Sequence, residues 1–280
     1  MLVKSLVLSV AAAAVAVDAS KILVPLYSYS ENCWPELQTA AAANPSASFI
    51  AIINPNSGPI LDTSDPSLYC VPVLRQKIPN LTVVGYVRTD YGNRAPKDVL
   101  ADIATYKKWA GLKVSEGGVS GSPTVDGIFF DETPTFSDTT VGFDKYVLYS
   151  RTARQRLGSK STIIFNPGTG ANTRLYSYAD LVVTYEDYYK NFAAAKLPRT
   201  AKLQQKSAIM IHTIPSDTTT LQAVLKSVVP RYGAVYITDA NLDEVDVYQV
   251  WGSNWSAFVQ NFVAFNKSAA SKLRRAITLE

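Results

Sequence analysis

The chain alternates short apolar runs with segments of helical composition about eight times along its length. The runs are rich in β-branched and aromatic residues and are apolar almost throughout; they are KILVPLYSYS, SFIAIINP, LTVVGYVRT, VDGIFFDE, STIIFNPG, LVVTYEDY, SAIMIHT and AVYITD. Half-exposed antiparallel strands would instead alternate apolar with polar residues. The runs therefore favour parallel strands that are covered on both faces.

The intervening segments supply the covering helices. Helical composition is clearest over residues 35–43, 95–111, 143–158, 217–233 and 254–273. The third of these ends in Arg154, Arg156 and Gly158, a pattern that favours a helix stop. Repeated strand–helix units predict an α/β fold, a single (β/α)8 barrel of the TIM type, over residues 20–280. A doubly wound open sheet is the alternative, but it usually has fewer strands, and no glycine-rich nucleotide loop follows the first run.

The ends of the runs are where a barrel of this kind carries its chemistry, because active sites lie at the carboxyl ends of the strands. Polar residues are common there in any case, since loops begin at these points. The residue types go further, being mainly carboxylates, amides and tyrosines: Tyr27, Tyr29, Asn54, Arg88, Asp90, Asp131, Glu132, Asn166, Glu186, Asp187, His212 and Asp239.

Three carboxylates in this set suit the hydrolysis of a glycosidic bond. Asp131 and Glu132 are adjacent at one strand end, and Glu186 lies at the end of a strand two further on. Glycosidases use one carboxyl group to protonate the leaving oxygen and a second as nucleophile or base. If the strand continues through both residues, alternation sends Asp131 and Glu132 to different sides, so only one of them is expected to face the sugar directly. The competing interpretation is that the adjacent pair forms an ordinary turn, helix cap or salt bridge.

The remaining strand-end residues are candidates for substrate binding, because tyrosine rings stack on sugar faces while hydroxyl, amide and charged groups bond to sugar hydroxyls. The expected contacts are Tyr27, Tyr29, Asn54, Arg88, Asp90, Asn166, His212 and Asp239. His212 could equally be a hydrogen-bonded residue of the barrel mouth. A lone histidine cannot form a metal site by itself, so we expect no metal and no other cofactor.

The first nineteen residues have the pattern of a secretory signal peptide. Lys4 precedes an apolar run from Leu6 to Val17, and cleavage is expected after Ala19. The run is shorter than the ~18–20 residues that span a bilayer. We expect a secreted monomer, extracellular or associated with the cell wall, and no membrane partner for the mature form. The net charge of +4 gives no reason to expect a nucleic-acid partner.

Secretion would place the two cysteines in an oxidising compartment. A disulfide between Cys33 and Cys70 is then the expectation, with two buried free thiols as the alternative. Three sequons, at Asn80, Asn254 and Asn266, fit a glycoprotein.

Seven stretches give the chain a family resemblance: ILVPLYSY, IINPNSGP, GYVRTDYG, VDGIFFDE, FNPGT, TYEDYY and VYITD. Over nearly the whole mature length it resembles the spherulin 4 family, the spherulation-specific cell-surface proteins of fungi and slime moulds, classed as glycoside hydrolase family 135. The resemblance implies a (β/α)8 barrel that cleaves α-1,4-linked N-acetylgalactosamine within galactosaminogalactan, a fungal biofilm exopolysaccharide. It also implies that the catalytic acids are Asp131, Glu132 and Glu186.

The sequence thus predicts an endo-acting glycoside hydrolase whose working pair is Asp131 and Glu186, with Glu132 supporting or replacing one of them. The residues leave open which carboxylate is the acid. One alternative is a wall or spore-coat protein that binds polysaccharide without cutting it. Another is a carboxylate-metal phosphodiesterase, which the scarcity of histidine and the lack of clustered lysine or arginine disfavour.

Overall fold

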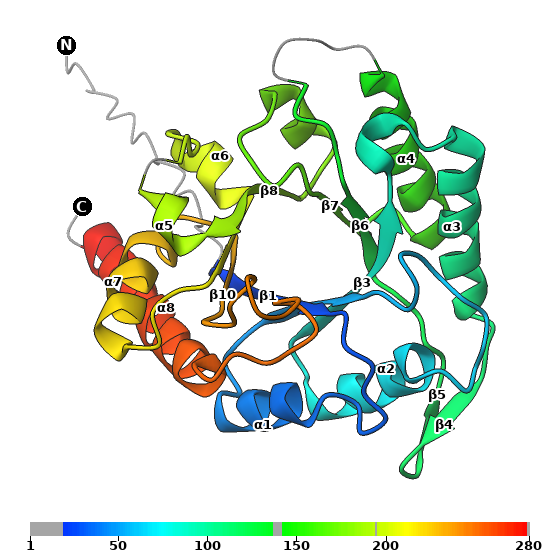
Figure 1. The fold of residues 1–280 in the computed structure, drawn as a ribbon, viewed down its shortest axis with the longest axis horizontal. Coiled ribbons are helices and arrows are strands. Elements are labelled where there is room, and N and C mark those ends of the chain that lie inside the picture. Colours follow the sequence, from blue (N-terminus) through cyan, green and yellow to red (C-terminus); the bar gives the residue numbers. More distant parts are fainter. Residues whose placement is uncertain (1–18, 137–141, 194, 279–280) are drawn as a thin grey trace, which may run out of the picture.

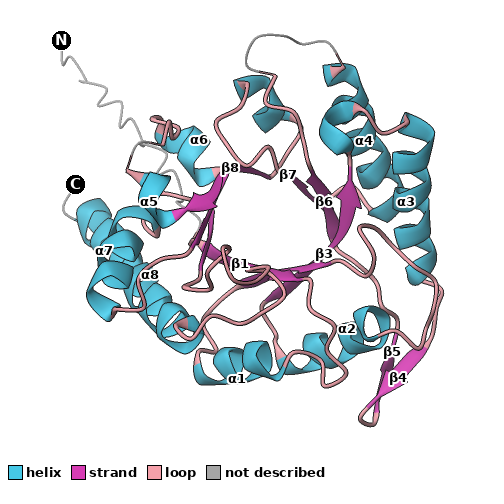
Figure 2. Cartoon of the chain, in the orientation of Figure 1, coloured by secondary structure: helices cyan, strands magenta, loops and turns pink. Residues whose placement is uncertain are grey.

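The eight predicted strands form a closed parallel barrel in the computed structural model, which describes residues 19–136, 142–193 and 195–278. Figures 1 and 2 show the strands as a central ring with the helices outside it. In chain order the strands are β1 (Lys21–Leu26), β2 (Phe49–Ile53), β3 (Leu81–Arg88), β6 (Gly127–Asp131), β7 (Thr162–Phe165), β8 (Leu181–Tyr188), β9 (Ser207–His212) and β10 (Ala234–Ile237). Each pairs with its neighbours along the chain, and β1 pairs with β10 to close the ring. The predicted TIM-type barrel is confirmed.

Burial on both faces explains why the strands are apolar almost throughout. Every residue of β2, β9 and β10 is buried, because one face fills the barrel interior and the other lies under helices. The helices are α1 (Pro35–Ala43), α2 (Pro66–Lys77), α3 (Pro96–Trp109), α4 (Phe143–Leu157), α5 (Tyr189–Phe192), α6 (Ala201–Gln205), α7 (Thr218–Val228) and α8 (Trp255–Thr278). All five predicted helical segments are helices, and Gly158 ends α4 as predicted.

One helix of the repeat was not predicted, and several small elements depart from the repeat. Helix α2 was not among the predicted helices, and Pro72 lies inside it. Its N-terminus is capped by Asp65, which accepts a hydrogen bond from Ser67 N. A small antiparallel hairpin, β4 (Val114–Glu116) with β5 (Val119–Gly121), follows α3. After β7 the chain forms only a 3₁₀ helix, η2 (Thr173–Ser177). Another 3₁₀ turn, η1 (Asp90–Gly92), follows β3 at the barrel mouth.

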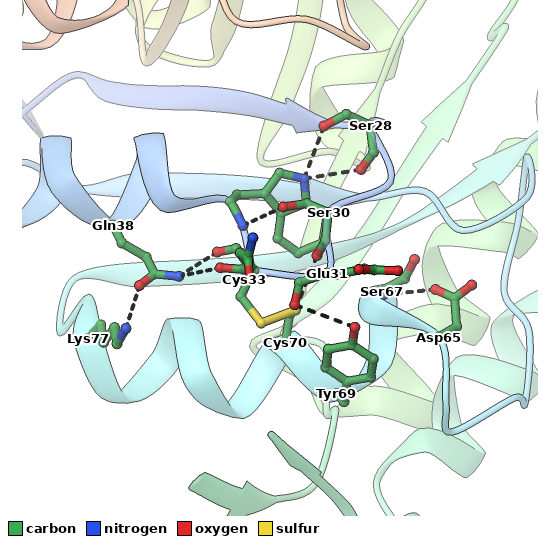
Figure 3. Close-up of a disulfide and its surroundings, with 12 residues drawn as sticks. Ser28, Ser30, Glu31, Cys33, Gln38, Asp65, Ser67, Tyr69, Cys70 and Lys77 are labelled. Atoms are coloured by element: carbon green, nitrogen blue, oxygen red, sulfur yellow. Dashed lines mark hydrogen bonds between the residues drawn. A yellow bond between two sulfur atoms is a disulfide. The ribbon is translucent and has the colours of Figure 1, made fainter. Parts of the chain in front are cut away.

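The predicted disulfide between Cys33 and Cys70 is present (Figure 3). It joins the loop after β1 to α2, and the Cα atoms of Cys33 and Cys70 are 5.0 Å apart. Neighbouring side chains hold the same loop: the Trp34 indole N–H donates to Ser28 O at 3.2 Å, and Gln38 Nε2 donates to Cys33 O at 2.6 Å. The loop that leaves β1 at the barrel mouth is therefore fixed both covalently and by hydrogen bonds.

The three sequons lie in different surroundings. Asn80 is exposed, whereas Asn254 is only 6% exposed and accepts a hydrogen bond from Asp239 N. Asn266 exchanges two hydrogen bonds with the backbone of Ser20, which ties the start of the barrel to α8. Asn80 is therefore the position where a glycan would fit without displacing structure.

The expected signal peptide, residues 1–19, lies outside the described residues except at its last position. Among the described helices, none combines the length and the apolar character needed to cross a membrane.

Candidate active site

The site is built where β6, β7 and β8 end side by side. Phe130 pairs with Phe165, so Asp131 and Asn166 are the next residues on neighbouring strands. Glycine at position 127 permits this pairing, because a Cβ there would lie 1.9 Å from Thr162 O. Glu186 reaches the same point from β8, and its N–H donates to Gly168 O at 2.8 Å. The strands that carry Asp131 and Glu186 are two apart, as predicted.

The side-chain amide of Asn166 joins the two carboxylates. Its Nδ2 donates to Asp131 Oδ1 at 2.7 Å and to Glu186 Oε2 at 2.6 Å. Its Oδ1 accepts from Gly168 N at 2.9 Å, which assigns the amide orientation. Two oxygens that accept hydrogen bonds of these lengths from one nitrogen can be no further apart than the ~5–5.5 Å that separates the carboxyl groups of retaining glycosidases. The carboxyl groups of inverting glycosidases are ~6.5–9.5 Å apart.

Asp131 is surrounded by hydrogen-bond donors. Its second oxygen, Oδ2, accepts from the Tyr86 hydroxyl at 2.6 Å. Burial raises the pKa of Asp131 above its ordinary value, and the hydrogen bonds from Tyr86 and Asn166 act in the opposite direction because they stabilise the ionised form. These donors suit a carboxylate that works in its charged state.

Glu186 has the more strongly shifted pKa of the pair. Burial, and then the nearby charge of Asp131, raise the pKa of Glu186 to about 7. The Tyr248 hydroxyl lies within hydrogen-bonding reach of the Glu186 carboxylate and partly offsets this rise, as does Asn166. At slightly acidic pH, Glu186 therefore holds a proton that it can donate.

Glu132 turns away from this pair. Its φ of 53° is in the left-handed region, and the backbone carbonyl accepts from Tyr91 N at 2.7 Å. Its side chain accepts from Arg88 Nε at 2.9 Å, while Arg88 also donates to Asp90 at 3.0 Å. Asp90 and Tyr91 also have positive φ values, so three non-glycine residues with strained backbone lie close together at the mouth. Asp131 and Glu132 thus face different surroundings, but β6 ends at Asp131, so the left-handed backbone at Glu132 and not strand alternation separates them.

The carboxylates open into a cleft of about 990 Å³. This is at the upper end of the ~300–1,000 Å³ range of small-molecule sites, so the cleft has room for more than one sugar ring. Tyr91 on its rim is 62% exposed, and Lys190 and Lys196 bring positive charge to the β8 side. The other residues along the cleft include Asp131, Glu132, Asn166, Gly168, Tyr185, Glu186, Asp187, Asn191, His212, Leu242, Asp246 and Tyr248.

Several other predicted residues are near the carboxylates. The Tyr27 ring packs edge-on against Tyr86 at 5.6 Å between centroids. His212 lines the cleft, and its Nδ1 lies 3.0 Å from the Thr213 hydroxyl; burial lowers the pKa of His212, so the imidazole is neutral at neutral pH. Among the described residues, no group of three or more histidine, cysteine, aspartate or glutamate side chains is arranged to hold a metal ion.

Six predicted residues are not among the described residues that line the cleft. Three of them contact its lining or rim: Tyr27 packs against Tyr248, and Arg88 joins Glu132 to Asp90. The other three lie apart from it. Tyr29 is 71% exposed beyond the end of β1. Asn54 follows β2, and its Oδ1 is buried with no hydrogen-bond partner among the described atoms. Asp239 binds its own loop, accepting from Asn254 N at 3.3 Å and from the Ser253 hydroxyl. A polar residue at a strand end is thus not enough to place a side chain in the site.

Sequence reasoning missed Tyr248, Tyr91, Lys190, Lys196 and Asp246, all of which line the cleft. Tyr86 was noted only as part of a tyrosine-rich strand end and was given no role. Tyr91 and Lys190 lie within four residues of predicted positions, so a wider window around each strand end would have included them. Tyr248 comes from the long segment between β10 and α8, where no periodic pattern marks it.

The comparisons with known proteins agree with this arrangement. The family model described as "Spherulation-specific family 4" matches residues 21–262. Spherulin-4 of Physarum polycephalum is 32% identical over 234 residues, which are 78% of this chain and 63% of that protein. The chain thus spans less than two thirds of the length of this relative.

Solved structures show the same barrel. The crystal structure of Aspergillus clavatus Sph3 in complex with GalNAc has a TM-score of 0.76 and 28% identity, covering 88% of this chain and 98% of that one. A fungal endo-β-N-acetylglucosaminidase of glycosyl hydrolase family 18 shares only the fold, with a TM-score of 0.52 and 12% identity over 89% of this chain and 98% of that one. The barrel is thus one that glycoside hydrolases also use, and the chain belongs to the spherulin 4 family, spherulation-specific family 4.

Proposed function

We propose that this protein is a glycoside hydrolase that cleaves internal α-1,4-linked N-acetylgalactosamine in a galactosaminogalactan-type exopolysaccharide. The observation that carries the proposal is the pair Asp131 and Glu186, held by one amide of Asn166 inside a cleft at the barrel mouth. A protein that only bound polysaccharide would have no need to hold two carboxylates this close, because like charges repel. The GalNAc complex of Sph3 supports the choice of sugar.

The surroundings of the two carboxylates support separate roles. Glu186, whose pKa is raised to about 7, is suited to protonate the glycosidic oxygen. Asp131, bonded to Tyr86 and Asn166, is suited to attack the anomeric carbon as a carboxylate. The short spacing supports a covalent glycosyl–Asp131 intermediate and retention of configuration. Glu186, now ionised, would then take a proton from the water that releases the sugar and restores both residues.

An α-linked substrate also calls for a nucleophile from the protein. Some enzymes that act on 2-acetamido sugars use the acetamido oxygen of the substrate in place of a carboxylate nucleophile. That oxygen attacks from the face opposite the leaving group. In α-linked N-acetylgalactosamine the acetamido and leaving groups lie on the same side of the ring, so this route is closed. A substrate of this linkage therefore requires the second carboxylate that Asp131 provides.

Glu132 fits a supporting role at the rim. The Arg88 guanidinium fixes its carboxylate, and the side chain remains 27% exposed where it borders the cleft. From there it can accept hydrogen bonds from sugar hydroxyl or acetamido N–H groups. We further propose that the chain is secreted and acts as a monomer at or outside the cell wall; recovery of the mature chain from culture medium, starting at Ser20, would test the targeting part.

The direct test is release of new reducing ends from purified galactosaminogalactan, with and without a chelator. Activity that survives chelation and is lost in Asp131→Asn and Glu186→Gln is expected. Matched controls are Asp98→Asn and Glu36→Gln, which make the same chemical changes at exposed positions on α3 and α1 and should keep full activity. Binding without cleavage in the wild-type protein would instead favour the non-catalytic wall protein, and loss of activity with chelator would favour metal-dependent chemistry.

A further inference from the structure

Three tyrosines from separate parts of the chain meet at the carboxylate pair. Tyr27 follows β1, Tyr86 lies in β3, and Tyr248 lies between β10 and α8. The Tyr27 ring packs edge-on against both of the others, with centroid distances of 5.6 Å to Tyr86 and 5.7 Å to Tyr248. Burial, and then the charges of Asp131 and Glu186, raise the pKa of Tyr27 above its ordinary value.

The outer two tyrosines use different carboxylates. The Tyr86 hydroxyl donates to Asp131 at 2.6 Å, and the Tyr248 hydroxyl lies within hydrogen-bonding reach of Glu186. Asn166, by contrast, donates to both carboxylates at nearly equal distances. Each of these two tyrosines therefore interacts with one carboxylate, whereas Asn166 binds both.

From this geometry we propose that Tyr86 and Tyr248 are positioning residues that act one on each carboxylate: Tyr86 holds Asp131 as the anion, and Tyr248 orients Glu186 and stabilises the carboxylate that remains once Glu186 has donated its proton. The proposal rests on the hydrolase function proposed above and deepens it. Neither tyrosine is asked to exchange a proton with the substrate. Each acts through the carboxylate to which its hydroxyl points.

The physical need for two separate donors comes from the short spacing of the pair. Two carboxyl groups that share a site and a common partner tend to share one proton between them, because both cannot ionise easily. A hydroxyl that donates to one oxygen favours the ionised form of that group alone. The 2.6 Å contact from Tyr86 is short, as expected for a hydrogen bond to an ionised acceptor. It therefore holds the negative charge on Asp131.

The two tyrosines are anchored differently. Tyr86 is fixed within β3, where its ring stacks on Phe129 at 6.1 Å. Tyr248 belongs to a loop that other contacts hold across the mouth: the Tyr188 hydroxyl donates to Asp243 at 2.7 Å, and Thr213 N donates to Ala240 O at 3.0 Å. The partner of the proposed nucleophile is thus part of the barrel, and the partner of the proposed acid is part of the segment that covers it.

The charged, titratable and amide groups around the pair come from several strands and loops of the barrel mouth. Asp131 is faced by Tyr86, Glu132, Asn166, Tyr27 and Glu186, and Glu186 is faced by Asp131, Asn166, Tyr248 and Tyr27, with Tyr91 and Asp246 slightly further out. Tyrosine-to-phenylalanine changes alter only the two donors and leave every other charge in place.

The test compares the pH dependence of kcat/KM in wild type, Tyr86→Phe and Tyr248→Phe, using the reducing-end assay. Loss of the Tyr86 donor raises the pKa of Asp131 and should move the acidic limb up by about one pH unit, which narrows the profile. Loss of the Tyr248 donor raises the pKa of Glu186 and should move the alkaline limb up by a similar amount, which widens the profile. KM should change little in either variant.

A second readout needs no activity. Carboxyl carbon signals of Asp131 and Glu186, identified by their loss in Asp131→Asn and Glu186→Gln, can be titrated by NMR in ¹³C-labelled protein. Tyr86→Phe should raise mainly the midpoint of Asp131, and Tyr248→Phe mainly that of Glu186. If wild type cleaves nothing, the proposed hydrolase function fails, while these titrations still decide the tyrosine assignment. The assignment is overturned if either variant leaves both midpoints unchanged, or if both variants move the same one.

Discussion

The two halves of the barrel mouth use the same kinds of residues differently. Around β6, β7 and β8, the polar side chains that follow the strands point at one another, and Asn166 joins Asp131 to Glu186. Around β10, β1 and β2, Tyr27 packs against Tyr86 beside that pair, but Asp239 serves its own loop and accepts from the backbone of Asn254 and from Ser253. Tyr29 extends outward and is 71% exposed.

The difference shows what makes a strand end part of a site. Both halves satisfy the rule that polar residues end parallel strands. In the β6–β8 half, the hydrogen-bonding partner of each carboxylate belongs to another strand, and its pKa is raised by burial. In the β10 half, the partner of Asp239 is its own following loop. A hydrogen-bonding partner that is distant in the sequence, rather than position at a strand end, distinguishes a candidate catalytic carboxylate from one that only holds its own loop.

The largest expected difference between the halves is in turnover. Asp131→Asn and Glu186→Gln should each reduce kcat by about 10²–10⁴-fold, the usual contribution of a catalytic acid or base. The matched change in the other half, Asp239→Asn, should leave kcat within about threefold. The double variant Asp131→Asn/Glu186→Gln should lose far less than the product of the single losses, because the pair acts as a unit. Equal losses of kcat in Asp131→Asn and Asp239→Asn would contradict the difference between the two halves.

A second difference should appear in stability. The folded-state pKa of Glu186 is about 7 against an ordinary 4.5, so between these pH values the folded protein keeps a proton that the unfolded chain has lost. This contribution to stability is complete below pH 4.5 and disappears as the pH rises through 7. Glu186→Gln removes the penalty, and it should be more stable than wild type by ~1–3 kcal/mol at pH 8. Urea unfolding at pH 4.5 and pH 8 measures the difference, which should be near zero at the lower pH.

Asp239→Asn should have the opposite effect on stability. An amide can accept through only one oxygen, so either the Asn254 N–H or the Ser253 hydroxyl loses its partner. We expect a loss of ~1 kcal/mol, or about 2–4 °C in Tm, at all pH values between 5 and 8. Thermal unfolding at several pH values checks this, and a gain in stability like that of Glu186→Gln would contradict a structural role.

The smallest difference should separate two exposed tyrosines. Tyr91→Ala, on the cleft rim, should raise KM about three- to tenfold, because the substitution removes a surface on which a sugar ring can stack. Tyr29→Ala, outside the cleft lining, should leave KM within about twofold. Steady-state kinetics on size-fractionated oligosaccharides make the comparison, and a larger effect at Tyr29 would extend the substrate path over β1.

Much of the fold could be predicted because strand and helix patterns are local. The runs and their order gave the barrel, and Gly158 gave the end of α4. Helix α2 was hidden because Pro72 and Cys70 interrupt its pattern, and the β4–β5 hairpin because its strands have only three residues each. The candidate carboxylates could also be placed at one mouth, since their strands are two apart.

The contacts between those residues could not be predicted. Asn166 was a candidate for binding sugar, but its position between Asp131 and Glu186 depends on the register of three strands and on the irregular pairing of β8 with β9. Tyr248 reaches Glu186 through a loop path that no periodicity describes. The direction of the Glu132 side chain depends on a left-handed backbone at a residue that is not glycine.

The disulfide gives the barrel a property that hydrogen bonds alone could not. Cys33 and Cys70 are 37 positions apart, and the covalent ring they close contains α1, the whole of β2 and the exposed residues 61–64. A protease that cut the exposed stretch would leave both fragments joined through sulfur, with β2 still paired between β1 and β3. We therefore expect the fold to persist after a single cut there, because the fragments could not diffuse apart and the loop that carries Tyr27 would stay joined to α2.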